Sequence, residues 1–265
     1  MTAKEKIGFV RFLDLTDDYI RDGHKREREE YNFADDTPLS TNTVEKADSI
    51  SGLPLAYMIE EPSDSADSSE SGESDDSPEI IAAEIAACKA CGLSADRINT
   101  VPGEGVVRPL VMVIGEGPGA DEDAAGRPFV GKAGQLLDKM LESIGLFRGK
   151  NCYIANMVKC RPPGNRDPEP EEIASCFPFL ERQILALRPH LILCAGRFAA
   201  QNLLKTSRGI NALRGKFTET RIGKTIIPVL PTFHPSAILR DESLKRPAWE
   251  DLKLLKAKLE SMNKE

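Results

Sequence analysis

The sequence predicts an α/β fold, in which a parallel sheet is covered by helices on both sides, preceded by an acidic extension that does not fold. Two observations predict the sheet: short, continuous apolar runs that end in loops, and amphipathic segments that alternate with those runs along the chain. A third observation, the change in composition near residue 78, separates the extension (1–78) from the folded domain (79–265).

The extension is set apart by its charge. Residues 1–78 hold 8 Lys and Arg against 20 Asp and Glu, whereas residues 79–265 hold 27 against 22. The net charge of −7 therefore conceals a mildly basic domain and does not argue against a nucleic-acid partner. Residues 60–78 contain eight acids and seven serines, which leaves little to bury and predicts disorder. Residues 1–59 are expected to be mostly disordered with a transient helix, or alternatively to act as a docking peptide or a self-inhibitory strip that mimics DNA charge.

Strands and helices alternate through the folded domain. The strands are short apolar runs, as is typical of parallel strands buried on both faces. They are expected at 110–115, 152–156, 190–195 and 226–231. The helices show apolar residues at spacings of three and four. They are expected at 79–90, 132–145, 167–187, 197–204 and 245–262. Ligands of such sheets bind beyond the carboxyl ends of the strands.

Three of the expected strands lead into loops rich in glycine, proline and polar residues. These loops read GEGPGADEDAAGRPFVG (115–131), NMVKCRPP (156–163) and PTFHPS (231–236). Glycine lets the backbone approach a ligand closely, and proline stiffens the path of the chain. The first loop lacks the lysine of a P-loop and the glycine spacing of a dinucleotide site. Since Glu116 would repel a phosphate, the loops favour a neutral or cation-like reacting centre.

Four of the six cysteines form two pairs that suit a metal site. Cys88 and Cys91 are spaced Cys-x2-Cys, and Cys160 and Cys176 are spaced Cys-x15-Cys. Neither a signal peptide nor a membrane-spanning apolar run is evident, so a cytoplasmic chain is expected, and disulfides are rare in that compartment. Four thiolates can hold zinc or an iron–sulfur cluster, and the spacing does not decide between them.

Taken together, these motifs resemble the family 4 uracil-DNA glycosylases, which carry a four-iron cluster. The resemblance covers about residues 80–262 and rests on the four cysteines and three segments in order. The segments read GEGPGADEDAAGRPFVGKAGQLLDKML (115–141), NMVKCRPPGNRDPEPEEIASCFPFLERQI (156–184) and PTFHPSAILR (231–240). The resemblance implies a three-layer α/β/α sandwich with a four-stranded, mostly parallel sheet, in agreement with the number of expected strands. It also implies a monofunctional enzyme of base excision repair, which hydrolyses the N-glycosidic bond of uracil in DNA and leaves an abasic site.

The resemblance implies a role for each of the principal strand-end residues. Phe129 is expected to stack on an extruded uracil, and Asn156 to pair with its ring N–H and 4-carbonyl. His234 is expected to donate a hydrogen bond to the 2-carbonyl oxygen, which gains negative charge as the glycosidic bond breaks. Glu116 is the first candidate for the carboxylate that stabilises the cation-like sugar and orients water, with Glu122 second.

Several further residues complete the expected site. Asp123 is a third candidate carboxylate, and Gly117 and Pro118 are expected beside the substrate. Leu239 is expected as a wedge in the base stack and Arg240 as a phosphate contact. The other candidates for DNA contact are Ser236 and Arg161, with Asn165 and Arg166 as helpers. The resemblance implies that one structural [4Fe–4S] cluster is bound by Cys88, Cys91, Cys160 and Cys176.

Two alternative functions remain open at this stage, and DNA is the expected partner. Residues 159–166 contain no histidine, so ordinary turnover is expected instead of the covalent adduct that some relatives form. A non-catalytic DNA-binding protein with a four-cysteine zinc site is one alternative. The other is a glycosylase of broader base specificity, like the family 5 enzymes, which lack the counterpart of Glu116. The expected partner is uracil-containing DNA, single- or double-stranded, bound by a monomer whose acidic extension weakens nonspecific binding at low salt.

Overall fold

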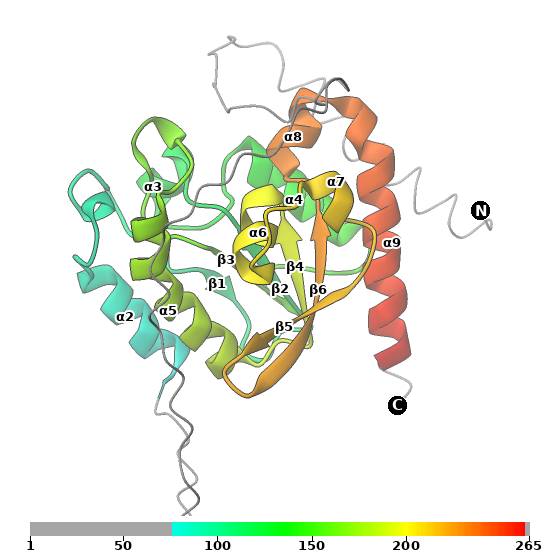
Figure 1. Cartoon of the computed structure of the whole chain (residues 1–265), viewed down its shortest axis with the longest axis horizontal. Helices are drawn as coiled ribbons and strands as arrows, with labels where there is room; N and C mark the ends of the chain where they lie inside the picture. Colours follow the sequence, from blue (N-terminus) through cyan, green and yellow to red (C-terminus); the bar gives the residue numbers. More distant parts are fainter. Residues whose placement is uncertain (1–75, 263–265) are drawn as a thin grey trace, which may run out of the picture. The chain divides into compact units, whose positions relative to one another are not determined.

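Residues 76–262 are described by the computed structural model, and they form a domain around one sheet (Figure 1). The sheet has six strands in the order β1-β3-β2-β4-β6-β5. The strands are β1 (Glu104–Gly105), β2 (Val111–Gly115), β3 (Cys152–Asn156), β4 (Leu191–Ala195), β5 (Thr218–Ile222) and β6 (Thr225–Thr232). Except for its last three residues, the acidic extension expected at 1–78 lies outside the described residues.

The four expected strands are the inner strands of this sheet, and they are mutually parallel, as predicted. The two edge strands were not expected, and each pairs antiparallel with its neighbour. Strand β1 is only two residues long, and β5 follows a pattern of exposed and buried positions without a continuous apolar run. Neither edge strand therefore carries the signal that revealed the buried strands.

Helices cover both faces of the sheet, which gives the three layers implied by the resemblance. The α-helices are α2 (Pro78–Ala87), α3 (Ala120–Ala125), α4 (Lys132–Glu142), α5 (Pro170–Leu187), α6 (Arg197–Leu204), α7 (Ile210–Leu213), α8 (Pro235–Arg240) and α9 (Lys245–Met262). Short 3-10 turns lie at Gly92–Ser94, Pro163–Asn165 and Glu242–Leu244. Helix α6 packs against β2, β4 and β6 on the face toward the viewer in Figure 1, and α4 lies behind the sheet. Within residues 76–262, no helix combines the length and the apolar character needed to cross a bilayer.

The helices differ from the expected ones in several places: α2 ends at Ala87 instead of residue 90, α4 ends at Glu142 instead of residue 145, and the short helices α3, α7 and α8 were not expected. Helix α5 begins at Pro170 and not at Asp167, because Glu169 caps it: the Glu169 amide donates to the Glu172 carboxylate at 2.7 Å. The segment after His234, interpreted above as a loop, is helix α8. His234 caps α8 and Pro235 occupies its first position, where a missing amide costs nothing.

The register of the parallel strands aligns their carboxyl ends. Gly115 of β2 lies opposite Asn156 of β3, and Ala195 of β4 lies opposite Thr232 of β6. The loops that follow β2, β3, β4 and β6 therefore leave the sheet at the same end, where the parallel strands have their carboxyl ends. Parallel sheets bind ligands at this end, and all three loops that the sequence singled out lie there.

A buried ion pair supports the loop that carries His234. Asp251 of α9 is 0% exposed, and its carboxylate accepts hydrogen bonds from Thr232 Oγ1 at 2.7 Å and from Arg214 Nε and Nη2 at 3.0 and 2.8 Å. The Arg214 guanidinium also lies 5.0 Å from the centre of the Phe233 ring. Thr232 and Phe233 lead directly into His234, so this network ties the loop to α9.

We predict that Asp251→Ala lowers the free energy of unfolding by about 3–5 kcal/mol, because it leaves Arg214 beside the core without its counter-charge. Glu250→Ala is the matched control on the same helix, since Glu250 pairs with Lys253 at the surface and should change stability by less than about 1 kcal/mol. Urea unfolding of both variants measures the difference. Equal effects would contradict a supporting role for the buried pair.

Candidate active site

Gly115 lies at the centre of the candidate site. A Cβ atom placed on this glycine would come within 2.4 Å of Asn156 Oδ1 and 2.5 Å of the tip of the Phe129 ring. The amide of Asn156 and the ring of Phe129 therefore converge on the same small volume, at the carboxyl ends of β2 and β3. A second close approach occurs at Gly196, where a Cβ would come within 2.9 Å of the Cβ of His234.

Asn156 presents an acceptor that the described residues do not satisfy. The residue is 1% exposed, and its Oδ1 has no hydrogen-bond partner there. Its backbone carbonyl is held by the buried Nζ of Lys159 at 2.8 Å, and Lys159 in turn donates to Gln183 Oε1 at 2.7 Å. A buried amide oxygen without a partner costs about 1–3 kcal/mol, which a ligand with a correctly placed N–H would recover.

His234 is held as a neutral imidazole with its proton on Nε2. The Ser236 amide donates to Nδ1 at 3.1 Å, so Nδ1 is an acceptor and the ring proton resides on Nε2. Burial lowers the pKa of His234 to about 4, and the charge of Arg240 acts in the same direction. The imidazole is tilted by 34° to the Phe129 ring, with 5.6 Å between their centres. His234 therefore offers a neutral Nε2–H donor beside Phe129.

Glu116 follows Gly115 directly and has a strongly perturbed carboxyl group. Burial raises its pKa to about 7, and the neighbouring Asp167 adds to the shift through charge repulsion and a hydrogen bond. Arg197 opposes the shift and donates to Asp167 at 3.1 Å. Perturbed carboxyl groups of this kind cluster at functional sites.

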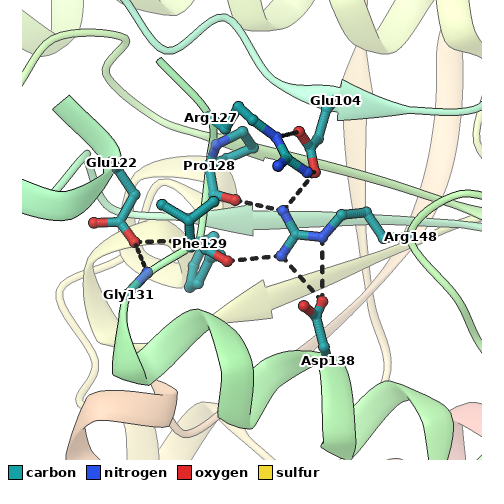
Figure 2. Close-up of polar contacts among 9 residues, drawn as sticks. Glu104, Glu122, Arg127, Pro128, Phe129, Gly131, Asp138 and Arg148 are labelled. Carbon is teal, nitrogen blue, oxygen red and sulfur yellow. Dashed lines mark hydrogen bonds and ion pairs between the residues drawn. The ribbon is translucent and has the colours of Figure 1, made fainter. Parts of the chain in front are cut away.

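The Glu122 carboxylate accepts hydrogen bonds from backbone amides and thereby fixes the loop carrying Phe129 (Figure 2). Its Oε1 accepts from the amides of Val130 and Gly131, both at 2.9 Å, and its Oε2 accepts from the Gly119 amide at 3.1 Å. Three hydrogen bonds to backbone amides occupy the carboxylate. This geometry favours a positioning role over the catalytic one considered for Glu122 above.

The other residues expected near the substrate have different surroundings. Asp123 is 2% exposed, and its Oδ1 accepts from the amides of Ile98 and Asn99, so it anchors the segment before β1. Gly117 packs closely on Val158, and Pro118 is buried. The loop after β2 is thus packed against the first residues after β3.

The expected DNA-contacting residues lie on or near the same edge of the sheet. Leu239 is half-buried and packs partly on the core, and Arg240 is exposed at the end of α8. Ser236 is bound to His234, with 2.7 Å between Oγ and Nδ1. Arg161 donates to Asn165 Oδ1 at 2.8 Å. Their roles on DNA stay predictions, as does that of Arg166, which forms an ion pair with Glu172 at 2.6 Å.

The four paired cysteines line one cavity beside the loop that follows β3. The cavity is lined, among others, by Cys88, Cys91, Cys160 and Cys176. Three of the sulfur atoms accept hydrogen bonds: Cys88 Sγ from the Ala90 amide at 3.5 Å, Cys160 Sγ from Arg97 at 3.2 Å and Cys176 Sγ from the Lys159 amide at 3.2 Å. Within residues 76–262, no three His, Cys, Asp or Glu side chains are close enough to hold a single metal ion. Four thiols that line one cavity are a donor set that either zinc or an iron–sulfur cluster can take.

Several functional candidates were missed by the sequence reasoning. Arg197 follows Gly196 at the end of β4, so it occupies a fourth strand-end position that the strand pattern alone could have indicated. Asp167 was interpreted only as a helix start. Lys159 and Arg148 carry no local signal, because what distinguishes them is burial and hydrogen bonding to distant segments.

Comparison with known proteins relates this chain to one family. Residues 102–253 match the uracil DNA glycosylase superfamily. The chain is 44% identical over 188 residues to the type-4 uracil-DNA glycosylase of Saccharolobus solfataricus, with 69% of this chain and 87% of that protein covered. It is 44% identical over 177 residues to the type-4 enzyme of Archaeoglobus fulgidus (65% and 88% covered). It is 42% identical over 182 residues to that of Thermotoga maritima (68% and 93% covered).

The chain belongs to the uracil-DNA glycosylase superfamily and, within it, to the type-4 uracil-DNA glycosylases. The family predicted from the sequence motifs is therefore confirmed. The comparisons give no support to the two alternatives, a zinc-stapled DNA-binding protein and a glycosylase of broader base specificity.

Proposed function

We propose that this protein excises uracil from DNA by hydrolysing the N-glycosidic bond, and that it leaves an abasic site without cutting the strand. The observation that carries the proposal is the buried, unpartnered Oδ1 of Asn156 beside Phe129 and His234. Uracil presents a ring N–H to such an acceptor, whereas cytosine presents a ring nitrogen with a lone pair. A cytosine in this site would leave buried polar groups unpaired, which disfavours it strongly.

Base recognition combines one stacking face and two polar groups. A uracil inside a duplex is out of reach, so the nucleotide must leave the stack, at a cost of a few kcal/mol. The Phe129 ring supplies the stacking face. Asn156 Oδ1 accepts from the ring N–H, and its Nδ2 donates to the 4-carbonyl oxygen. The contacts that replace base stacking and pairing therefore come from the loops at one edge of the sheet.

Departure of the base is assisted by a neutral donor. As the glycosidic bond breaks, its electron pair passes into the uracil ring and negative charge builds on the 2-carbonyl oxygen. The Nε2–H of His234 donates to this oxygen, and the Ser236 amide keeps that proton on Nε2. Because the donor is fixed in advance, it stabilises the transition state more than the ground state.

Glu116 is proposed to act on the deoxyribose. The deoxyribose becomes cation-like as the base departs, and the ionised Glu116 carboxylate stabilises it and orients the attacking water. Glu122 is assigned to the loop and not to this step, because backbone amides occupy its carboxylate.

The four cysteines around the cavity are proposed as ligands of one [4Fe–4S] cluster with a structural role. Bound there, the cluster would supply no step of the hydrolysis, which needs no change of oxidation state. It would join the segment after α2, the loop after β3 and helix α5, from which Cys88 and Cys91, Cys160 and Cys176 come. We further propose that the enzyme acts as a cytoplasmic monomer on single- or double-stranded DNA, with Leu239 and Arg240 contacting the strand.

The first test is excision from a single-uracil oligonucleotide, detected by alkaline cleavage at the abasic site. We predict that Asn156→Ala and His234→Ala each lower the single-turnover rate by about 10²–10³-fold, because each removes one fixed polar contact to the departing base. His190→Ala, at an exposed position, is the matched control and should keep the rate of the unmodified protein. Unchanged rates in the first two variants would refute the site.

The second prediction concerns pH. Glu116 must be ionised to act on the sugar, so the single-turnover rate should rise with pH through about 7, the pKa of this carboxyl. His234 is already neutral over this range and adds no second step. Asp167→Asn removes a charge that raises the Glu116 pKa, so the midpoint should move to lower pH. Glu116→Gln should abolish the rise, and a rise that survives this change would assign it to another group.

The third prediction concerns the cluster. The purified protein should be brown, with broad visible absorbance and bound iron and sulfide. Cys160→Ala should lose the colour and the iron, whereas Cys194→Ala should keep both, because Cys194 is buried inside β4, where it packs as a small apolar residue. A colourless protein that binds zinc would contradict the assignment.

A further inference from the structure

The loop that carries Phe129 adopts a backbone conformation that its sequence does not favour. Phe129 has a φ of +52°, in the left-handed region that residues with a side chain rarely adopt. Such a conformation costs about 1–3 kcal/mol and persists only where the surroundings determine it. Gly134 is needed close by, since a Cβ on it would collide with the backbone carbonyl of Phe129. The position of the ring therefore depends on contacts that hold this backbone.

Arg148 supplies the contacts on the carbonyl side of the loop (Figure 2). Its Nη1 donates to the carbonyl of Pro128 and its Nη2 donates to that of Phe129, the latter at 2.7 Å. The remaining N–H groups donate to Asp138 Oδ1, at 3.2 and 3.0 Å, and to Glu104 Oε1, at 2.7 Å. Each of the five guanidinium donors thus has an acceptor, and the side chain is only 15% exposed.

Arg148 and Glu122 together fix both peptide groups that adjoin Phe129. The peptide before Phe129 is held through the Pro128 carbonyl. The peptide after it is held at both ends, since its carbonyl accepts from Arg148 and its amide, that of Val130, donates to Glu122 at 2.9 Å. With both peptide planes held, the φ and ψ angles of Phe129 are determined, and so is the direction in which its side chain leaves the backbone.

Phe129 is buried in the core, but the loop is not fully packed on the side where Arg148 lies. A cavity of about 400 Å³ adjoins the loop there, and its lining includes Arg127, Phe129, Asp138 and Arg148. Close packing is what usually rigidifies a protein interior. Beside this cavity, the hydrogen bonds of the Arg148 guanidinium add rigidity to the loop backbone.

We propose that Arg148 is a positioning residue for uracil excision, which holds the Phe129 backbone in its left-handed conformation so that the ring is presented to the extruded base. The proposal rests on the stacking role proposed for Phe129. Glu104 and Asp138 orient the guanidinium in turn: hydrogen bonds from Arg127 and Arg148 lower the pKa of Glu104 although burial opposes them, so Glu104 stays an anionic acceptor. A lysine would keep the charge but could not span both carbonyls and both carboxylates from one nitrogen.

The test is Arg148→Lys, compared with Arg127→Lys. Arg127 shares Glu104 with Arg148, at 2.7 Å, but it is 61% exposed and, among residues 76–262, its guanidinium donates to Glu104 and not to a loop carbonyl. We expect Arg148→Lys to lower the single-turnover excision rate by about 10- to 100-fold, because misplacement of a binding group by about 1 Å costs this much. Arg127→Lys should stay within about twofold of the unmodified protein.

Hydrogen–deuterium exchange distinguishes positioning from general destabilisation. In Arg148→Lys, the amides of peptides that cover residues 126–131 should exchange faster, while those of the inner strands keep their protection. Faster exchange throughout the domain, or unchanged exchange in this loop, would overturn the proposal. If Arg148→Lys does not fold, Asp138→Asn takes its place, since it weakens the same guanidinium without removing it.

A double-mutant cycle with Phe129→Ala separates this inference from the proposed stacking role. If Arg148 acts through the ring, Arg148→Lys should slow excision far less in the Phe129→Ala background than alone. Equal effects in both backgrounds would overturn the positioning role. A normal rate in Phe129→Ala itself would instead refute stacking by Phe129, and the exchange of the loop amides would still report whether Arg148 holds the backbone.

Discussion

Asn156 and Phe129 both occupy the space that a side chain at position 115 would fill. This constraint links the sheet to the chemistry. The register that sets Gly115 opposite Asn156 brings the amide to the end of β2, and the absence of a Cβ lets the ring reach the same point. A similar close approach at Gly196 admits His234 from the neighbouring strand end. The groups proposed to bind the base can therefore meet only because β2 ends in Gly115 and β4 is followed by Gly196.

Several largely buried charged side chains lie close to the candidate site. Asp251 accepts from Thr232, two residues before His234, Lys159 donates to the Asn156 carbonyl, and Arg148 donates to the Phe129 carbonyl. Replacing a buried ion pair by apolar residues is often neutral or stabilising, so such groups are a poor source of stability. What they provide here is position, because each holds the backbone or a nearby side chain of a residue proposed to bind the base. This fits an enzyme whose contacts must be in place before the bond breaks.

The inner strands and most helices could be predicted from the sequence, because burial on both faces or on one stripe leaves a periodic apolar pattern. Phe129, Asn156 and His234 were selected as candidates because they lie in motifs that follow such strands, and the structure places Phe129 next to both of the others. The edge strand β5 and the role of Arg148 could not be predicted in this way. Strand β5 is polar at most positions, and the significance of Arg148 lies in acceptors 10 to 44 residues away. The hydrogen bonds of Glu122 to backbone amides could not be predicted either, because a carboxylate in a motif does not reveal which donors it meets.

The loop after β3 connects base recognition to the four cysteines over a very short stretch of chain. Asn156 and Cys160 are separated by three residues, and Lys159 between them contacts both regions: its Nζ holds the Asn156 carbonyl and its amide donates to Cys176 Sγ. A shift of Cys160 or Cys176 would therefore move Lys159, and with it the backbone of Asn156. The structural centre proposed at the cysteines would thus matter to a hydrolysis in which it takes no part, because it would fix the far end of the segment that positions the amide.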